Sequence, residues 1–67
     1  MHENWVKVHD AEPTLAKIIV GMLKEHDINA IILNQQDSLY HNFGGAEVYV
    51  ERDDAVKAKT LIEKFNS

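Results

Sequence analysis

Cysteine is absent from the 67-residue chain, so the sequence offers no disulfide framework, no thiolate nucleophile and no cysteine-based zinc site. This composition predicts a cytoplasmic protein. Basic residues are also few, since seven Lys and Arg stand against eleven Asp and Glu and give a formal net charge of -4. A field of that sign repels phosphate backbones, and the basic residues are scattered among acids. We therefore expect no nucleic-acid partner.

Long apolar runs are missing as well. The longest apolar-rich segment, LAKIIVGML at residues 15–23, is interrupted by Lys17 and is too short to cross a bilayer. The N-terminal MHENW has no basic region followed by an apolar stretch, so we expect a soluble protein that does not bind membranes. A chain this short makes one domain, residues 1–67, and buries only about 60% of its unfolded surface. Self-association is an expected source of further stability.

Three segments have the patterns of strands. Residues 5–9 alternate, which is typical of a half-buried strand that points Val6 and Val8 at the core. Residues 30–33, AIIL, form a short apolar run without helical length. Residues 46–51, AEVYVE, alternate again and place the valines on one side and Glu47, Tyr49 and Glu51 on the other. The sequence therefore predicts three short strands.

Two segments have the 3.6-residue period of helices. Pro13 fits the first turn of a helix that ends near His26, and Asp27 is a plausible left-handed stop, whereas either Asp10 or Glu12 can cap its start. The expected buried stripe of this helix consists of Leu15, Ile18, Ile19, Met22 and Leu23. The second helix follows the acids at 53 and 54. Its expected buried stripe consists of Ala55, Ala58, Leu61, Ile62 and Phe65.

The resulting β-α-β-β-α order predicts an α+β fold, a two-layer ferredoxin-like unit without its last strand. We expect a three-stranded antiparallel or mixed sheet with the third strand in the middle, the first strand at an open edge and both helices on one face. The other face would be bare. There the alternation places four interface candidates, Trp5, Lys7, His9 and Tyr49, together with part of residues 30–33. Trp5 and Tyr49 either pack on the sheet or contact a second copy, and a homodimer through this face or the open edge is the expected assembly.

A polar connection, residues 34–45, separates the second and third strands and is long for so small a fold. Its candidate ligand-binding or partner-binding residues are Asn34, Asp37, Ser38, Tyr40, Gly44 and Gly45. One hypothesis is that this loop contacts a partner protein or a small ligand. The alternative is a structural homodimerising domain in which the loop only covers the sheet. The two glycines are expected to permit positive φ at the entry to the third strand.

No residue pattern points to catalysis, a metal or a cofactor. The four histidines lack the i, i+4 or H-x-H spacing of metal ligands. Asp37, Ser38 and His41 lie within one loop, whereas working triads converge from separate rigid elements. Gly44 and Gly45 lead into a strand rather than into a helix N-terminus, which excludes a P-loop. We therefore expect a protein that is not an enzyme.

Several stretches together resemble a known family. WVKV, GMLKEHDINA, NQQDSLY and FGGAEVYVERDDAVKAKTLIEK are similar to a small prokaryotic family of unknown function labelled "putative signal transducing protein". Asp27 replaces the glycine often found after the first helix of that family. The resemblance spans essentially the whole chain and implies a ferredoxin-like, GlnB-like domain, similar in fold to the nitrogen-regulatory PII proteins, and a signalling role. It implies no catalytic residue and no ligand. The PII fourth strand, protruding loop and nucleotide-contacting segments have no counterpart here.

Overall fold

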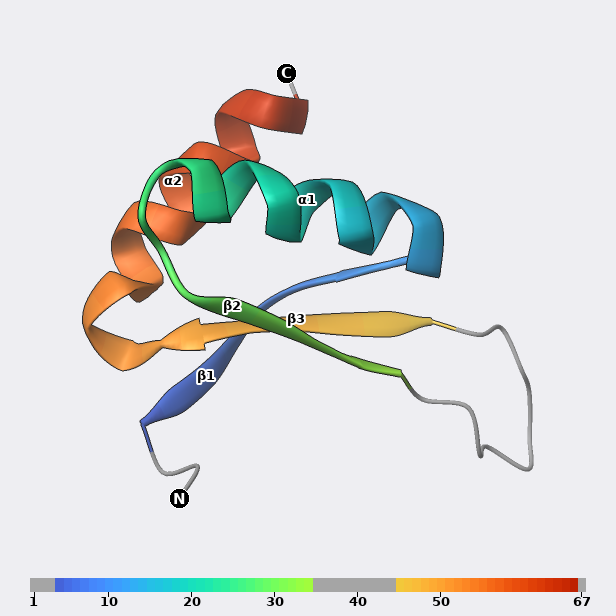
Figure 1. Ribbon diagram of the computed structural model, residues 1–67, viewed down its shortest axis with the longest axis horizontal. Coiled ribbons are helices and arrows are strands. Elements are labelled where there is room, and N and C mark those ends of the chain that lie inside the picture. The colour runs from blue at the N-terminus through green and yellow to red at the C-terminus, as the bar shows by residue number, and fades with distance from the viewer. Residues whose placement is uncertain (1–3, 35–44, 67) are drawn as a thin grey trace.

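The computed structural model describes residues 4–34 and 45–66 of the chain. Along these residues the elements are β1 (Trp5–Ala11), α1 (Pro13–Glu25), β2 (Ala30–Asn34), β3 (Ala46–Glu51), a short 3-10 turn η1 (Arg52–Asp54) and α2 (Ala55–Asn66). The predicted β-α-β-β-α order and the α+β class are confirmed (Figure 1).

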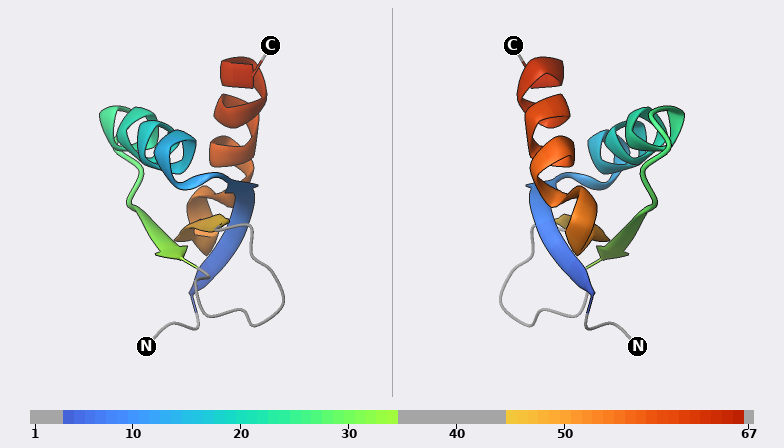
Figure 2. Two further views of the ribbon diagram at one scale, coloured as in Figure 1. Left: turned by 90° about the vertical axis from the view of Figure 1, so that its right-hand side faces the viewer. Right: turned by 90° about the vertical axis from the view of Figure 1, so that its left-hand side faces the viewer.

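The sheet has the order β1-β3-β2, and both neighbouring pairs are antiparallel. The prediction that β3 lies in the middle and β1 at an edge is therefore confirmed, and β2 forms the second edge. Both helices lie on one side of the sheet, as Figures 1 and 2 show. The layers agree with the predicted ferredoxin-like unit. The other side of the sheet, which we call the open face, is not covered by either helix.

β1 does not alternate regularly along its length. Its register against β3 shifts between Lys7 and His9, so that Lys7 pairs with Tyr49 and His9 pairs with Val48. Such a bulge inserts one extra residue and re-aims the side chains beyond it. His9 therefore lies across from a fully buried valine on the helix side of the sheet. Its predicted place on the open face is wrong, and Asp10, which pairs with Glu47, takes that place.

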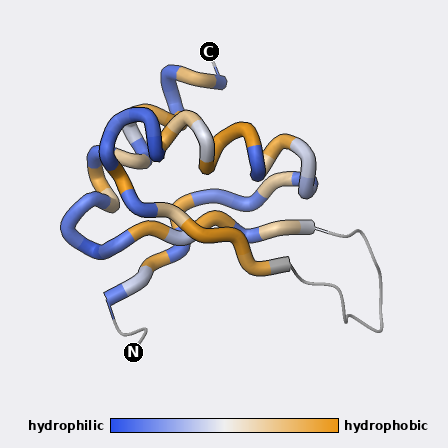
Figure 3. The backbone as a smooth tube through the Cα atoms, in the orientation of Figure 1, coloured by the Kyte–Doolittle hydropathy of each residue, from blue (hydrophilic) through white to orange (hydrophobic). Residues whose placement is uncertain are grey.

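The core lies between the sheet and the two helices. Its largest fully buried side chains are Ile19, Leu23, Ile28, Val48 and Val50. Figure 3 shows the strongly hydrophobic stretch along β2 that borders this layer. Each residue of β3 that points at the helices is buried, whereas those that point at the open face are only partly covered.

Two residues predicted for the buried stripes are exposed. Ile18 in α1 is 52% exposed and Phe65 in α2 is 40% exposed. α1 instead buries Ala16 and Val20 beside Ile19 and Leu23, which is another i, i+3, i+4, i+7 stripe. We attribute this choice to Ala16, because a small side chain at the contact lets the helix approach the sheet closely.

The end of α1 is a left-handed stop, as predicted. Asp27 has φ 66. Its N–H donates to the carbonyl of Lys24 (3.0 Å), and the N–H of Ile28 donates to the carbonyl of Leu23 (3.0 Å). This is a Schellman arrangement, and burial of Ile28 supplies the apolar contact that accompanies it. At the other end, Glu12 occupies the cap position without a side-chain hydrogen bond.

Candidate binding face

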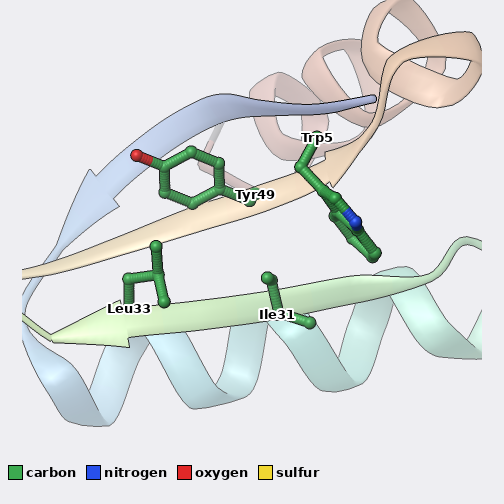
Figure 4. Close-up of a pocket in the computed structure, with 4 residues that line it drawn as sticks. All are labelled: Trp5, Ile31, Leu33 and Tyr49. Atoms are coloured by element: carbon green, nitrogen blue, oxygen red, sulfur yellow. The ribbon is translucent and has the colours of Figure 1, made fainter. Parts of the chain in front are cut away.

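The open face carries a pocket with largely apolar walls. Its walls are the side chains of Trp5 from β1, Ile31 and Leu33 from β2, and Tyr49 from β3. The pocket has a volume of about 240 Å³. Figure 4 shows that the indole of Trp5 extends toward β2, whereas the hydroxyl of Tyr49 points away from the pocket toward β1. Three strands therefore build one surface.

The strand register explains why these residues meet. Tyr49 lies opposite Lys7 on one side and opposite Ile31 on the other, and Leu33 lies opposite Glu47. Because side chains alternate along a strand, residues that pair across the sheet point to the same face. Ile31 is 37% exposed and Leu33 is 48% exposed. Two aliphatic side chains thus remain in contact with solvent beside two aromatic ones.

A polar group closes one end of the open face. The Nζ of Lys7 lies 3.3 Å from Asp10 Oδ2 and 3.7 Å from Glu47 Oε2. Tyr49 Oη donates a hydrogen bond to Glu47 Oε1 at 2.9 Å. These contacts depend on the bulge, because a regular β1 would present His9 where Asp10 now stands. The result is one ammonium held between two carboxylates.

The pKa directions in this group follow from the same contacts. The hydrogen bond with Asp10, followed by the charge of that carboxylate, raises the pKa of the Lys7 ammonium. The hydrogen bond to Glu47, followed by burial, raises the pKa of the Tyr49 phenol. Both pKa values move further from neutral pH, so neither group is poised to transfer protons there. The arrangement suits binding rather than acid-base chemistry.

A second pocket of about 270 Å³ lies among Asn4, Glu51, Arg52 and Asp53. The backbone N–H of Arg52 donates to the carbonyl of Asn4 across 2.6 Å, which joins the start of β1 to the start of η1. The side chains around this pocket carry charges of both signs. Within residues 4–34 and 45–66, no three His, Asp or Glu side chains come together as a metal site.

The chain matches one known protein family. Residues 5–66 match the model of a family described as "Putative prokaryotic signal transducing protein". The chain belongs to this family. No curated protein and no solved structure matches it. Among the described helices of this family member, none is long and apolar enough to cross a membrane.

The structure brings together three of the four predicted interface residues of this family member. Trp5, Lys7 and Tyr49 lie on the open face, whereas His9 does not. Sequence reasoning missed Asp10, because alternation alone gives no sign of a bulge. The position of Glu47 beside Tyr49 follows from the alternation of β3, although its link to Lys7 requires the register of β1.

The predicted loop residues are described only at the two ends of the loop. Asn34 ends β2 and pairs with Ala46, and Gly45 directly precedes β3. Gly45 does not adopt a left-handed φ, so the expected reason for that glycine is wrong. The other loop candidates lie outside the described residues: Asp37, Ser38, Tyr40 and Gly44.

Proposed function

We propose that this family member is a non-enzymatic regulatory module that signals by binding a partner protein through its open face. The observation that carries the proposal is the pocket between Trp5, Ile31, Leu33 and Tyr49, which is apolar and open to solvent. Aromatic side chains beside exposed aliphatic ones are typical of the centre of an interface. The setting we propose is the cytoplasm, as the composition predicts.

The size of the pocket favours a protein partner over a metabolite. Small-molecule sites usually enclose roughly 300–1,000 Å³ and bury most of the ligand. A pocket of about 240 Å³ on an open face is suited instead to one or two anchoring side chains of a larger partner. Signalling by such a module would depend on which partner occupies the face.

We also propose that the 34–45 segment contributes contacts to the same partner. The support is its point of attachment, because Asn34 pairs with Ala46 directly beyond the pair formed by Leu33 and Glu47. The segment therefore begins and ends beside one end of the open face. Asp37 and Tyr40 are the side chains to test first.

A comparative pull-down from source cells tests the proposal. Leu33→Asp places a charge in the pocket, and Val56→Asp places the same charge on α2, where Val56 is 79% exposed. We expect wild type and Val56→Asp to retain a common partner and Leu33→Asp to lose it. Asp37→Ala and Tyr40→Ala should weaken its capture. Equal capture by all variants would refute the proposed face and the proposed loop contacts.

Self-association is a second candidate, and the β2 edge favours it. Residues 30–33 are all apolar, and the register of β2 against β3 has no irregularity. The β1 edge differs, since it carries a bulge and two charged residues, Lys7 and Asp10, which are features that discourage edge pairing. A dimer through β2 would leave the open face available.

Sedimentation velocity over a wide range of concentrations tests this second candidate. We expect a dimer for the wild-type protein and a monomer for Ile31→Lys, because a lysine on an edge strand opposes pairing with another strand. A wild-type protein that stays monomeric at every concentration would exclude self-association.

A further inference from the structure

We infer that the open face receives a cationic amphipathic helix. This inference rests on the proposed function and names the kind of partner. In this arrangement an apolar side chain of the helix enters the pocket between Trp5, Ile31, Leu33 and Tyr49, and its basic residues meet the carboxylates at the ends of the face. Three observations support this inference: the backbone hydrogen bonds of the sheet, the charge of the open face and the dimensions of the open face.

The backbone hydrogen bonds of the sheet favour a helix over an extended peptide. β3 is paired on both sides, so its N–H and C=O groups are used within the sheet. An extended peptide laid flat on this face would leave its own N–H and C=O groups without partners. A helix pairs its backbone N–H and C=O groups with each other, so it can bind through side-chain contacts alone. Helix-in-groove recognition through apolar anchors is a common mode of this kind.

The charge of the face favours basic residues on that helix. Among the residues that the structure describes, the charged residues on the open face are Lys7, Asp10, Glu47 and Glu51. Within this described set, three acids against one base leave an excess of two negative charges. Lys7 is already held by Asp10 and Glu47, so its charge is compensated locally. Glu51 lies at the opposite end, across from Trp5, so carboxylates flank the apolar pocket on both sides.

The dimensions of the face match one helix. Three strands spaced about 4.8 Å apart span roughly 14 Å, and the six residues of β3 at about 3.3 Å each extend roughly 20 Å. A helix with side chains is about 10–12 Å wide, and roughly 13 residues reach 20 Å. The face has a flat area of about 280 Å², whereas each partner buries about 800 Å² in a standard stable interface. This area therefore suits a single helix better than a second copy of the chain. A second copy on this face would also bring two negatively charged surfaces together.

A designed peptide provides the direct probe. We would titrate the full chain with a capped 14-residue leucine-lysine peptide of helical period, and with a leucine-glutamate peptide that has the same leucine positions. Trp5 is the single tryptophan of the chain and lines the pocket, so its fluorescence reports occupancy. We expect saturable one-to-one binding of the leucine-lysine peptide with a blue shift of Trp5 emission. The leucine-glutamate peptide should bind at least ten-fold more weakly.

Matched variants separate the open face from general charge attraction. Leu33→Ser should weaken binding about ten-fold, whereas Val56→Ser on α2 should leave it within two-fold. Asp10→Asn should weaken binding about three-fold, whereas Glu25→Gln, which removes the same charge from α1, should not. Circular dichroism on each variant confirms that it is folded.

Three results would overturn the inference: no saturable binding, equal binding of both peptides, or equal weakening by Leu33→Ser and Val56→Ser. These outcomes differ from failure of the proposed function. If Leu33→Asp abolishes capture of a cellular partner while the leucine-lysine peptide does not bind, the open face is a binding surface for another kind of partner. If Leu33→Asp has no effect on capture, the proposed function itself fails.

Discussion

Tyr49 donates a hydrogen bond from its hydroxyl to the carboxylate of Glu47 at 2.9 Å, although only one residue separates the two along β3. Side chains two apart on a strand share a face, and this pair uses that geometry to join the apolar and the polar parts of the open face. The hydroxyl points away from the pocket toward β1 (Figure 4). Glu47 Oε2 in turn lies 3.7 Å from Lys7 Nζ, so β1 and β3 are linked through side chains as well as through their backbones.

The titration of Tyr49 should depend on Glu47. The hydrogen bond to Glu47 is the largest cause of the raised phenol pKa, so Glu47→Ala should lower the pKa of Tyr49 toward its ordinary value. Absorbance at 295 nm measures this in a Tyr40→Phe background, which leaves Tyr49 as the single tyrosine. Glu51→Ala on the same strand is the control. An identical Tyr49 midpoint with and without Glu47 would contradict the contact.

The raised pKa values of Tyr49 and Lys7 also predict how stability changes in alkali. Both groups have a higher pKa in the folded state than in the unfolded state. Their contribution to the free energy of unfolding is therefore fully present below the ordinary pKa values. It is lost as pH rises through the folded-state pKa values, above roughly pH 10. Urea midpoints between pH 8 and 11 should therefore fall less steeply for Glu47→Ala than for wild type. Parallel pH profiles would argue against this linkage.

The left-handed conformation at Asp27 should carry a cost that glycine removes. Asp27→Gly should raise the free energy of unfolding by about 0.5–1 kcal/mol, since glycine adopts positive φ without a clash between Cβ and the backbone. Asp27→Ala should lower it, because alanine tolerates this region less well than aspartate. Urea denaturation of the three proteins measures both changes. Equal stability of the glycine and alanine variants would show that the conformation at residue 27 carries no cost.

The orientation of α1 makes a further stability prediction. Ile19 has no exposed surface, so Ile19→Ala should cost about 2–5 kcal/mol through lost burial and a residual cavity. Ile18→Ala removes the same atoms from a residue that is 52% exposed and should cost under about 1 kcal/mol. Thermal or urea unfolding compares the two variants. A larger loss from Ile18→Ala would mean that the helix presents its other apolar edge to the sheet.

Local signals in the sequence were sufficient to predict the order of helices and strands along the chain and the order of strands in the sheet. Alternation defined β1 and β3, while Pro13 and Asp27 marked the ends of α1, and the structure has these elements close to the predicted residues. The position of β3 between the other strands followed from a right-handed crossover and one hairpin. These features depend on short-range sterics, which one sequence encodes well.

The buried side of α1 and the bulge in β1 were harder to predict from the sequence. The arc of apolar residues on α1 is wide enough to contain two stripes, and contact with the sheet selects the one with Ala16 and Val20 rather than Ile18. The bulge in β1 left no mark on the alternation of residues 5–9, so His9 was placed on the wrong side. Such features arise from pairing between strands distant in sequence and not from the strand alone.

The open face, rather than the helix layer, is the proposed contact surface for the partner. In-cell photo-crosslinking distinguishes these two surfaces, with a photoreactive amino acid placed at position 33 in one strain and at position 56 in another. We predict a discrete adduct with a second protein from position 33 and none from position 56, because Leu33 borders the pocket while Val56 lies exposed on α2. Adducts of equal yield from both positions, or from position 56 alone, would show that the open face is not the partner-binding surface.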